Sequence, residues 1–150
     1  MNINETLKHY FGYDSLRPGQ QELIEGILQR KDVLGIMPTG AGKSLCYQVP
    51  ALMLDGITIV VSPLISLMTD QVKALNQAGV HAAYINSSLT ENQIRTALFY
   101  AAQGRYKIIY VAPERLNTIR FLEFACQVDI SMVTVDEACL LYTSPSPRDA

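Results

Sequence analysis

The sequence predicts an α/β fold in which a mostly parallel sheet is flanked by helices. Short, continuous apolar runs alternate with longer segments of helical periodicity. Alternation of this kind is typical of a parallel sheet, and unbroken apolar runs suit strands that are buried on both faces. The chain has 150 residues, of which 49% are apolar and 17% charged, so it is about one domain long and can bury an ordinary core.

The elements follow in order. Residues 4–30 are expected to form two helices, the first ending near Gly12 and the second opening at Pro18, because proline suits a first helical turn. Strands are then expected at 33–36, 57–61, 108–111 and 132–135, with a further short strand at 81–85. Helices are expected at 43–54, 64–78, 90–103 and 114–127. Pro50 is expected to kink the first of these helices or to end its first part.

Composition limits the function classes. The net charge of −2 gives no overall signature of nucleic-acid binding, so any such contact must come from local groups. The three cysteines are widely spaced, which predicts reduced thiols and neither a disulfide nor a zinc site. The N-terminus has no targeting pattern and no apolar run approaches the roughly eighteen residues of a membrane helix. We therefore expect a soluble, cytoplasmic protein without membrane contact.

A candidate phosphate-binding loop follows the first predicted strand, at Met37-Pro38-Thr39-Gly40-Ala41-Gly42-Lys43-Ser44. Its glycines allow a tight turn that brings backbone N–H groups, and the positive end of the next helix, close to a polyphosphate. Lys43 would reach the β- and γ-phosphates, and the Ser44 hydroxyl would bind Mg²⁺. Met37 stands where the general pattern has its first glycine. The alternative is a glycine-rich turn with an accidental Gly-Lys-Ser.

Asp136 and Glu137 directly follow the predicted strand 132–135, at the end where open α/β sheets bind ligands. Asp136 would hold Mg²⁺, directly or through water. Glu137 would act as the base, or position the water, in attack on the γ-phosphate. The alternative is a solvated acidic turn.

Several motifs occur in a fixed order along the chain: Phe11-Gly12-Tyr13, Leu16-Arg17-Pro18-Gly19-Gln20, Met37 to Ser44 with its continuation Leu45-Cys46-Tyr47-Gln48-Val49-Pro50-Ala51-Leu52, Ser62-Pro63-Leu64-Ile65-Ser66-Leu67-Met68, Asp70-Gln71-Val72, Ala112-Pro113-Glu114-Arg115-Leu116 and Asp136-Glu137-Ala138. Together, from about residue 5 to 138, they resemble the motifs of RecQ-family DNA helicases. The resemblance implies a RecA-like P-loop NTPase domain at 1–138, incomplete at its C-terminus, with adenine-recognition helices at 1–30.

The resemblance also implies roles for individual residues. Tyr13 would stack on adenine, while Arg17 and Gln20 contact the nucleotide, with Gln20 at the adenine edge. The alternatives are a core aromatic for Tyr13 and a helix-opening turn for 17–20. Single-stranded DNA would contact loops at Ser62, Pro63 and Leu64 and at Pro113, Glu114 and Arg115. The alternative for these loops is ordinary punctuation between strand and helix.

The chain departs from the family pattern at two positions. Ala41 replaces the usual glycine of the loop, and Cys139 stands where a histidine is expected. Residues 139–150 contain two prolines and two serines and resemble an adapter-derived peptide, so we expect a disordered tail that is not native protein. Without the strand that normally follows the acidic motif, the sheet would have a gap with unpaired backbone groups and exposed apolar surface.

By resemblance, the intact protein is expected to be an ATP-dependent 3′-to-5′ DNA helicase of repair and recombination, using ATP and Mg²⁺ on single-stranded and duplex DNA. Because the family's arginine finger comes from a second domain, these 150 residues alone are expected neither to unwind DNA nor to turn over ATP appreciably. The alternatives are a superfamily 2 RNA helicase and a non-catalytic nucleotide-binding module. The oligomeric state stays open.

Overall fold

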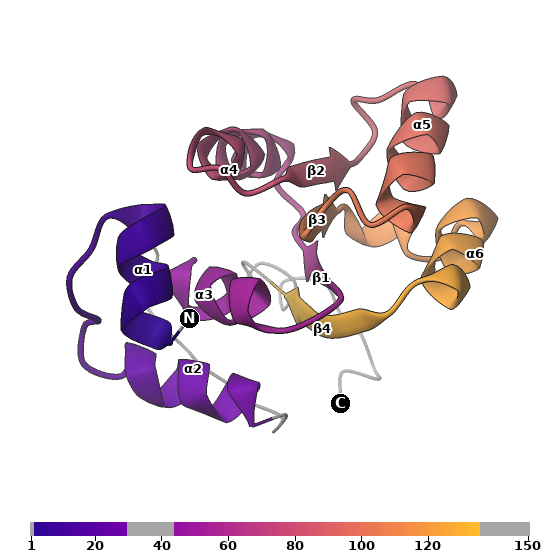
Figure 1. Cartoon of the computed structure of the whole chain (residues 1–150). Helices are drawn as coiled ribbons and strands as arrows, with labels where there is room; N and C mark the ends of the chain where they lie inside the picture. Colours follow the sequence, from indigo (N-terminus) through magenta and orange to yellow (C-terminus); the bar gives the residue numbers. More distant parts are fainter. Residues whose placement is uncertain (1, 30–43, 136–150) are drawn as a thin grey trace, which may run out of the picture.

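The computed structural model describes residues 2–29 and 44–135. Within them, a parallel sheet has the strand order β2-β3-β1-β4. The strands are β1 (Ile57–Val61), β2 (Ala82–Ile85), β3 (Ile108–Val111) and β4 (Ile130–Val135). The helices are α1 (Ile3–Phe11), α2 (Gln20–Leu28), α3 (Leu45–Met53), α4 (Ile65–Gln77), α5 (Glu91–Ala102) and α6 (Ile119–Gln127), with a short 3-10 helix, η1, at Pro113–Arg115 (Figure 1). The predicted α/β class with a parallel sheet is confirmed; the strand expected at 33–36 lies outside the described residues.

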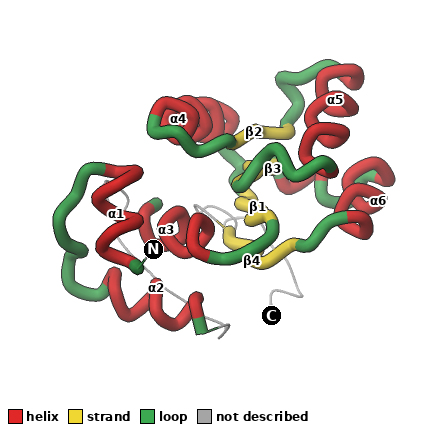
Figure 2. The backbone as a smooth tube through the Cα atoms, in the orientation of Figure 1, coloured by secondary structure: helices red, strands yellow, loops and turns green. Residues whose placement is uncertain are grey.

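The strand register brings the carboxyl ends of neighbouring strands to one level. Val61, the last residue of β1, is paired with Val111 at the end of β3 and with Val135 at the end of β4. The carboxyl ends of β1, β3 and β4 therefore lie at the same edge of the sheet. Figure 2 shows the strands of the sheet in yellow with the helices around them in red.

Helices cover both faces of the sheet, as Figure 1 shows. On one face, Val60, Ile108 and Tyr110 pack with residues of α3 and α4. On the other face, Ile59, Ile109 and Val111 pack with residues of α5 and α6. The side chains of β1 and β3 are buried along their whole length, which explains their unbroken apolar sequence.

The N-terminal helices form a third cluster with α3. Leu7 of α1, Ile24 of α2 and Val49 of α3 are fully buried and form one hydrophobic cluster. Helix α1 begins with a capping box between Asn2 and Glu5, and it ends at Gly12, whose φ of +76° suits glycine. α3 is thus enclosed between this cluster and the sheet, and Cys46 to Ala51 are all buried.

Two helix starts differ from the prediction. Helix α2 begins at Gln20 and not at Pro18, because Gly19 has a left-handed backbone (φ +89°) that no helix interior allows. The helix expected at 114–127 is interrupted, and α6 begins only at Ile119. Thr118 is extended there and its hydroxyl donates to the Arg115 carbonyl at 2.7 Å, a local bond that competes with helix formation.

Two further expectations concern Pro50 and β4. Of the two outcomes expected at Pro50, an end of the helix is excluded, since α3 continues to Met53 and the Leu54 N–H still donates to the Pro50 carbonyl at 2.9 Å, and a kink stays a prediction. Strand β4 begins two residues earlier than predicted and is not buried on both faces. Val133 is 61% exposed, because β4 is the edge of the described sheet and the described helices leave that side chain uncovered.

Candidate nucleotide-binding site

Ser44 lies at the amino end of α3, where a helix presents unpaired N–H groups and partial positive charge. Its backbone carbonyl accepts from the Gln48 N–H at 2.9 Å, the first intrahelical bond. Its side-chain hydroxyl accepts a hydrogen bond from Gln71 Nε2 of α4 at 3.1 Å. The other residues expected to bind phosphate, Thr39, Gly40, Ala41, Gly42 and Lys43, lie outside the described residues.

A polar network extends from Ser44 into the core. Gln71 Oε1 accepts from Gln48 Nε2 at 2.7 Å and from the Tyr110 hydroxyl at 3.2 Å. Gln48 Nε2 also donates to the Tyr110 hydroxyl at 3.0 Å, and the Tyr47 and Tyr110 hydroxyls are 3.1 Å apart. Tyr110 is fully buried, while Gln71 and Ser44 are only partly buried. The network therefore joins the sheet, α3 and α4 to one side chain of the phosphate motif.

Gln48 and Tyr110 stand in elements that are otherwise apolar, whereas Gln71 lies in the mixed polar and apolar helix α4. Tyr110 is the one polar side chain of β3, and its ring packs edge-on against the Tyr47 ring. Cys46, next to Tyr47, is a buried thiol on the same helix, and burial raises its pKa. We did not predict a role for Gln48, Gln71 or Tyr110 from the sequence. For Gln48 and Tyr110, the available signal was a polar side chain inside a strongly apolar segment; Gln71 lies among other polar residues and carries no such signal.

The predicted adenine-binding residues lie in and after the loop between α1 and α2. Tyr13 is 52% exposed and Arg17 is exposed, whereas Gln20 is almost fully buried at the start of α2. Gln20 Oε1 accepts from the Arg17 N–H at 2.7 Å. The buried amide thus fixes the turn between residues 17 and 20, and the exposed Tyr13 ring is not the core aromatic that was the alternative.

The structure brings the two predicted DNA-contact loops together. The loop after β1 contains Ser62, whose N–H donates to the Val111 carbonyl at 3.1 Å, directly before the loop at 113–115. Ser62 itself is fully buried and its hydroxyl accepts from the Leu64 N–H at 3.4 Å, while Leu64 is 39% exposed. Ser62 therefore holds the loop, and the surface that a ligand meets consists of Pro63 and Leu64.

Arg115 of the second loop already has an acidic partner, Glu91 at the start of α5. Arg115 Nη1 lies 3.5 Å from Glu91 Oε1, and Arg120 Nε lies 3.6 Å from the second oxygen of the same carboxylate. Glu114 is exposed and Pro113 begins the 3-10 helix η1. An incoming phosphate would have to compete with Glu91 for Arg115.

The acidic motif follows β4 directly. Strand β4 ends at Val135, level with Val61 of β1. Asp136 and Glu137 come next in the sequence and lie outside the described residues, as does the tail at 139–150. The expectations for these residues stay predictions.

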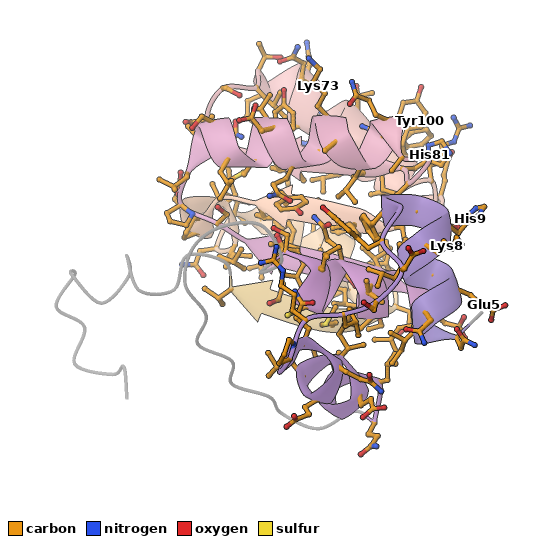
Figure 3. The ribbon with its side chains drawn as sticks, turned by 90° about the vertical axis from the view of Figure 1, so that its left-hand side faces the viewer. Glu5, Lys8, His9, Lys73, His81 and Tyr100 are labelled. Carbon is orange, nitrogen blue, oxygen red and sulfur yellow. The ribbon has the colours of Figure 1, made fainter. Side chains whose placement is uncertain are left out.

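A pocket of about 440 Å³ opens at the opposite edge of the sheet, where the strands begin. It is lined in part by His81, Arg105 and Lys107, and the Lys107 ammonium donates to the Leu54 carbonyl. Figure 3 shows His81 near His9 and Lys8 of α1 along this side of the molecule. Open α/β sheets bind ligands at the carboxyl ends of their strands, so this pocket is not the candidate nucleotide site.

The fit of Ser44 to Mg²⁺ can be judged from its surroundings. Mg²⁺ prefers oxygen ligands, and the Ser44 hydroxyl is a partly exposed oxygen that uses one lone pair for the bond from Gln71. A hydroxyl has a second lone pair for a metal ion. The described part of the motif therefore fits a bound Mg²⁺.

The family model for the DEAD/DEAH box helicase matches residues 17–144. The chain therefore belongs to the DEAD/DEAH box helicase family. This match includes Arg17 and Gln20 but not Tyr13, and it covers α3 and both loops at the carboxyl edge of the sheet.

Relatives of this helicase chain include proteins of bacteria and of a virus. It is 51% identical to the ATP-dependent DNA helicase RecQ of Bacillus subtilis (strain 168) over 133 residues, which are 88% of this chain and 22% of that protein. It is 46% identical to the ATP-dependent DNA helicase RecQ of Haemophilus influenzae over 89% of this chain and 22% of that protein. A putative ATP-dependent RNA helicase of Acanthamoeba polyphaga mimivirus is 40% identical over 91% of this chain and 25% of that protein. The chain thus spans about a fifth to a quarter of the length of these relatives.

Across residues 2–29 and 44–135, the longest helix is too short to cross a membrane. The helicase domain is instead built from short helices packed on a sheet.

Proposed function

We propose that this chain binds ATP together with Mg²⁺ and forms part of the motor of an ATP-dependent DNA helicase. The observation that carries the proposal is the position of Ser44, at the amino end of α3 and at the carboxyl side of a parallel sheet, with its hydroxyl oriented by Gln71. A helix N-terminus at this place suits a phosphate group. Membership of a helicase family supports the same ligand.

Ser44 and Asp136 are proposed to hold Mg²⁺, with Lys43 and the backbone of 39–42 on the phosphates. A Mg²⁺ ion held by these residues would offset the negative charge that develops on the phosphates during hydrolysis. Glu137 is proposed to position or deprotonate the attacking water. Tyr13 would stack on the adenine ring, for which its 52% exposure leaves the aromatic face accessible.

Single-stranded DNA is proposed to cross the loops after β1 and β3. The two loops lie side by side, which gives one continuous surface for a sugar-phosphate backbone. Buried Ser62 would act by holding the loop, and exposed Leu64 and partly buried Arg115 by contact. Direction of movement from 3′ to 5′, duplex unwinding, a role in repair and recombination, and a cytoplasmic location belong to the same proposal and rest on the resemblance to RecQ helicases.

Binding of a fluorescent ATP analogue to the full-length protein tests the nucleotide site. We expect binding that depends on Mg²⁺ and is lost in Lys43→Ala, because that ammonium is the expected partner of the β- and γ-phosphates. Lys73→Ala is the matched control, since Lys73 is an exposed lysine of α4. Equal binding by wild type and Lys43→Ala would contradict the proposed site.

An RNA helicase is the second candidate, and the viral relative named as a putative RNA helicase favours it. The Leu45-Cys46-Tyr47-Gln48 continuation and the Arg17-Pro18-Gly19-Gln20 form of the adenine motif favour a DNA helicase instead. Stimulation of ATP hydrolysis by single-stranded DNA and by single-stranded RNA of the same sequence, compared in the full-length protein, decides between them.

A non-catalytic nucleotide-binding module is the third candidate, and it predicts a different result for the 150-residue chain. Such a module should keep Mg²⁺-dependent affinity for the ATP analogue when it is isolated. A helicase motor that needs the rest of the protein should bind weakly or not at all in that form.

A further inference from the structure

We propose that Gln71 is a positioning residue that orients the Ser44 hydroxyl toward the Mg²⁺ of a bound nucleotide. The inference rests on the proposed function, in which Ser44 is a Mg²⁺ ligand. It concerns residues of α3, α4 and β3 that are all described, and it follows from their hydrogen bonds.

The hydrogen bonds around Gln71 share one consistent set of directions. Gln48 Nε2 has two N–H groups, which point to Gln71 Oε1 and to the Tyr110 hydroxyl. The Tyr110 hydroxyl donates its own proton to Gln71 Oε1. Gln71 Oε1 therefore accepts two bonds, which matches the two lone pairs of an amide oxygen. While Gln48 and Tyr110 act as donors, turning the Gln71 amide around would place its N–H groups against both of them.

The other end of the Gln71 amide consequently meets Ser44 as a donor. Gln71 Nε2 lies 3.1 Å from Ser44 Oγ. A hydroxyl that accepts one bond keeps one lone pair and its proton. Because the accepted bond fixes one lone-pair direction, it restricts where the second one points, and a metal ion needs that second lone pair. An unrestrained serine would lose rotamer freedom on binding the metal, whereas this one is already partly ordered.

The position of Gln71 is itself restrained by its surroundings. Its helix is anchored by Met68, Val72 and Leu75, all buried against the sheet. Its partners Gln48 and Tyr110 are 5% and 0% exposed. The buried residues thus restrain Gln71, and Gln71 in turn restrains Ser44, the member of the network that is proposed to bind Mg²⁺.

The test measures Mg²⁺ affinity separately from nucleotide affinity. Full-length protein is mixed with a fluorescent ATP analogue, first in EDTA and then with increasing Mg²⁺, for wild type and Gln71→Met. Methionine keeps the length of the side chain and removes its hydrogen bonds. We expect the apparent Mg²⁺ affinity to fall about tenfold or more, as is typical for the loss of a residue that orients a metal ligand. Binding in EDTA is expected to be unchanged.

Two controls separate positioning from a general loss of structure. Gln77→Met changes an exposed glutamine of the same helix and should leave both affinities unchanged. In a Ser44→Ala background, Gln71→Met should cause no further loss of Mg²⁺ affinity, because it acts through the missing hydroxyl. Tyr110→Phe removes a single hydroxyl that donates to Gln71, and it should lower Mg²⁺ affinity in the same direction by a smaller factor.

The outcomes are distinct. Unchanged Mg²⁺ affinity in Gln71→Met, an equal loss in EDTA, or a full additional loss in the Ser44→Ala background overturns the inference. Should Gln71→Met fail to fold, unchanged Mg²⁺ affinity in Tyr110→Phe overturns it instead. Wild-type protein that binds the analogue without any Mg²⁺ dependence contradicts the proposed function itself, and the inference with it.

Discussion

Tyr110 carries the hydroxyl at which most bonds of the polar network meet. The hydroxyl is fully buried and lies within hydrogen-bond distance of Tyr47, Gln48 and Gln71. A buried donor that loses its partner keeps the full cost of its lost hydration. Removing one oxygen from the network would therefore destabilise the fold, because it leaves neighbouring buried polar groups without a partner.

Replacement of this tyrosine by phenylalanine measures that cost. We expect Tyr110→Phe to lower the free energy of unfolding by about 1–3 kcal/mol, since the buried Gln48 amide loses an acceptor and the Tyr47 hydroxyl loses a hydrogen-bond partner. Urea unfolding is the measurement. Tyr84→Phe is the control, because Tyr84 pairs with Tyr110 across the strands and its hydroxyl makes no hydrogen bond with the described residues. Equal stability of both variants would mean that the Tyr110 hydroxyl is not part of a network.

The cysteines Cys46 and Cys126 should differ in reactivity. Burial raises the pKa of the Cys46 thiol, whereas Cys126 is exposed. The thiolate is the reactive form, so iodoacetamide should modify Cys126 first and Cys46 only after unfolding. Mass spectrometry of the peptides after a short exposure at pH 8 identifies the modified residue. Early modification of Cys46 would show that α3 is not enclosed.

The same pKa direction has a consequence for stability. The folded state binds the Cys46 proton more tightly than the unfolded chain does. The contribution of this thiol to the free energy of unfolding is therefore fully present below the unfolded thiol pKa of about 8.5. It is lost as the pH rises above that value toward the folded pKa. The urea midpoint should therefore fall between pH 8 and pH 10 in wild type, and fall less in Cys46→Ala.

The sequence predicts the motif residues but not their hydrogen-bond partners. Ser44 was recognised from its place after Gly-Lys, which is a local pattern. Its bond to Gln71 joins residues 27 positions apart, and that of Gln48 to Tyr110 joins residues 62 apart. Nothing in local spacing specifies which polar side chains meet in a core, so the network needed the structure.

At the scale of elements, the turn between α3 and β1 is a place where only glycine fits. Gly56 has a φ of +91°, and a Cβ at this position would lie 2.6 Å from the carbonyl oxygen of Asp129. Gly79 also has a positive φ, of +92°, but an added Cβ would meet nothing within 4 Å. Comparing substitutions at the two glycines thus separates the cost of a left-handed backbone from the cost of a steric clash.

Alanine at these two positions should cost different amounts. Gly79→Ala is expected to lower the free energy of unfolding by about 1 kcal/mol, the cost of a left-handed backbone alone. Gly56→Ala is expected to cost more, roughly 2–4 kcal/mol, because the backbone at Asp129, just before β4, must also move. Chemical denaturation of both variants is the measurement. Similar costs would mean that Gly56 and Asp129 are not in close contact.

Most elements were predictable, and their exact starts were not. The strands at 57–61 and 108–111 coincide with the apolar runs, because burial on both faces leaves a plain signal. The starts of α2 and α6 depend on the backbone of Gly19 and on one hydrogen bond of Thr118, which periodicity does not contain. The exposure of Val133 depends on what covers β4, which is a property of the whole sheet.

At the scale of the whole molecule, the chain spans about a fifth of the length of its RecQ relatives. The resemblance to RecQ helicases places the arginine that completes hydrolysis in a second domain. An arginine supplied by a second domain is worth roughly 10³–10⁵ in rate in related motors. The separate chain should accordingly show ATP turnover at least about a thousandfold below that of the full-length protein.

That expectation is checked by measuring phosphate release from the purified 150-residue chain with and without single-stranded DNA. No stimulation by DNA and no strand separation are expected. Robust turnover by the separate chain, abolished by Lys43→Ala, would contradict it and would place all groups needed for hydrolysis within these residues.

The most direct test of the central claim is DNA-stimulated ATP hydrolysis by the full-length protein, compared between wild type, Lys43→Ala and the control Lys73→Ala. The account predicts strong stimulation by single-stranded DNA in wild type and in Lys73→Ala, and its loss in Lys43→Ala. Hydrolysis that persists in Lys43→Ala, or that responds to RNA and not to DNA, would contradict the account.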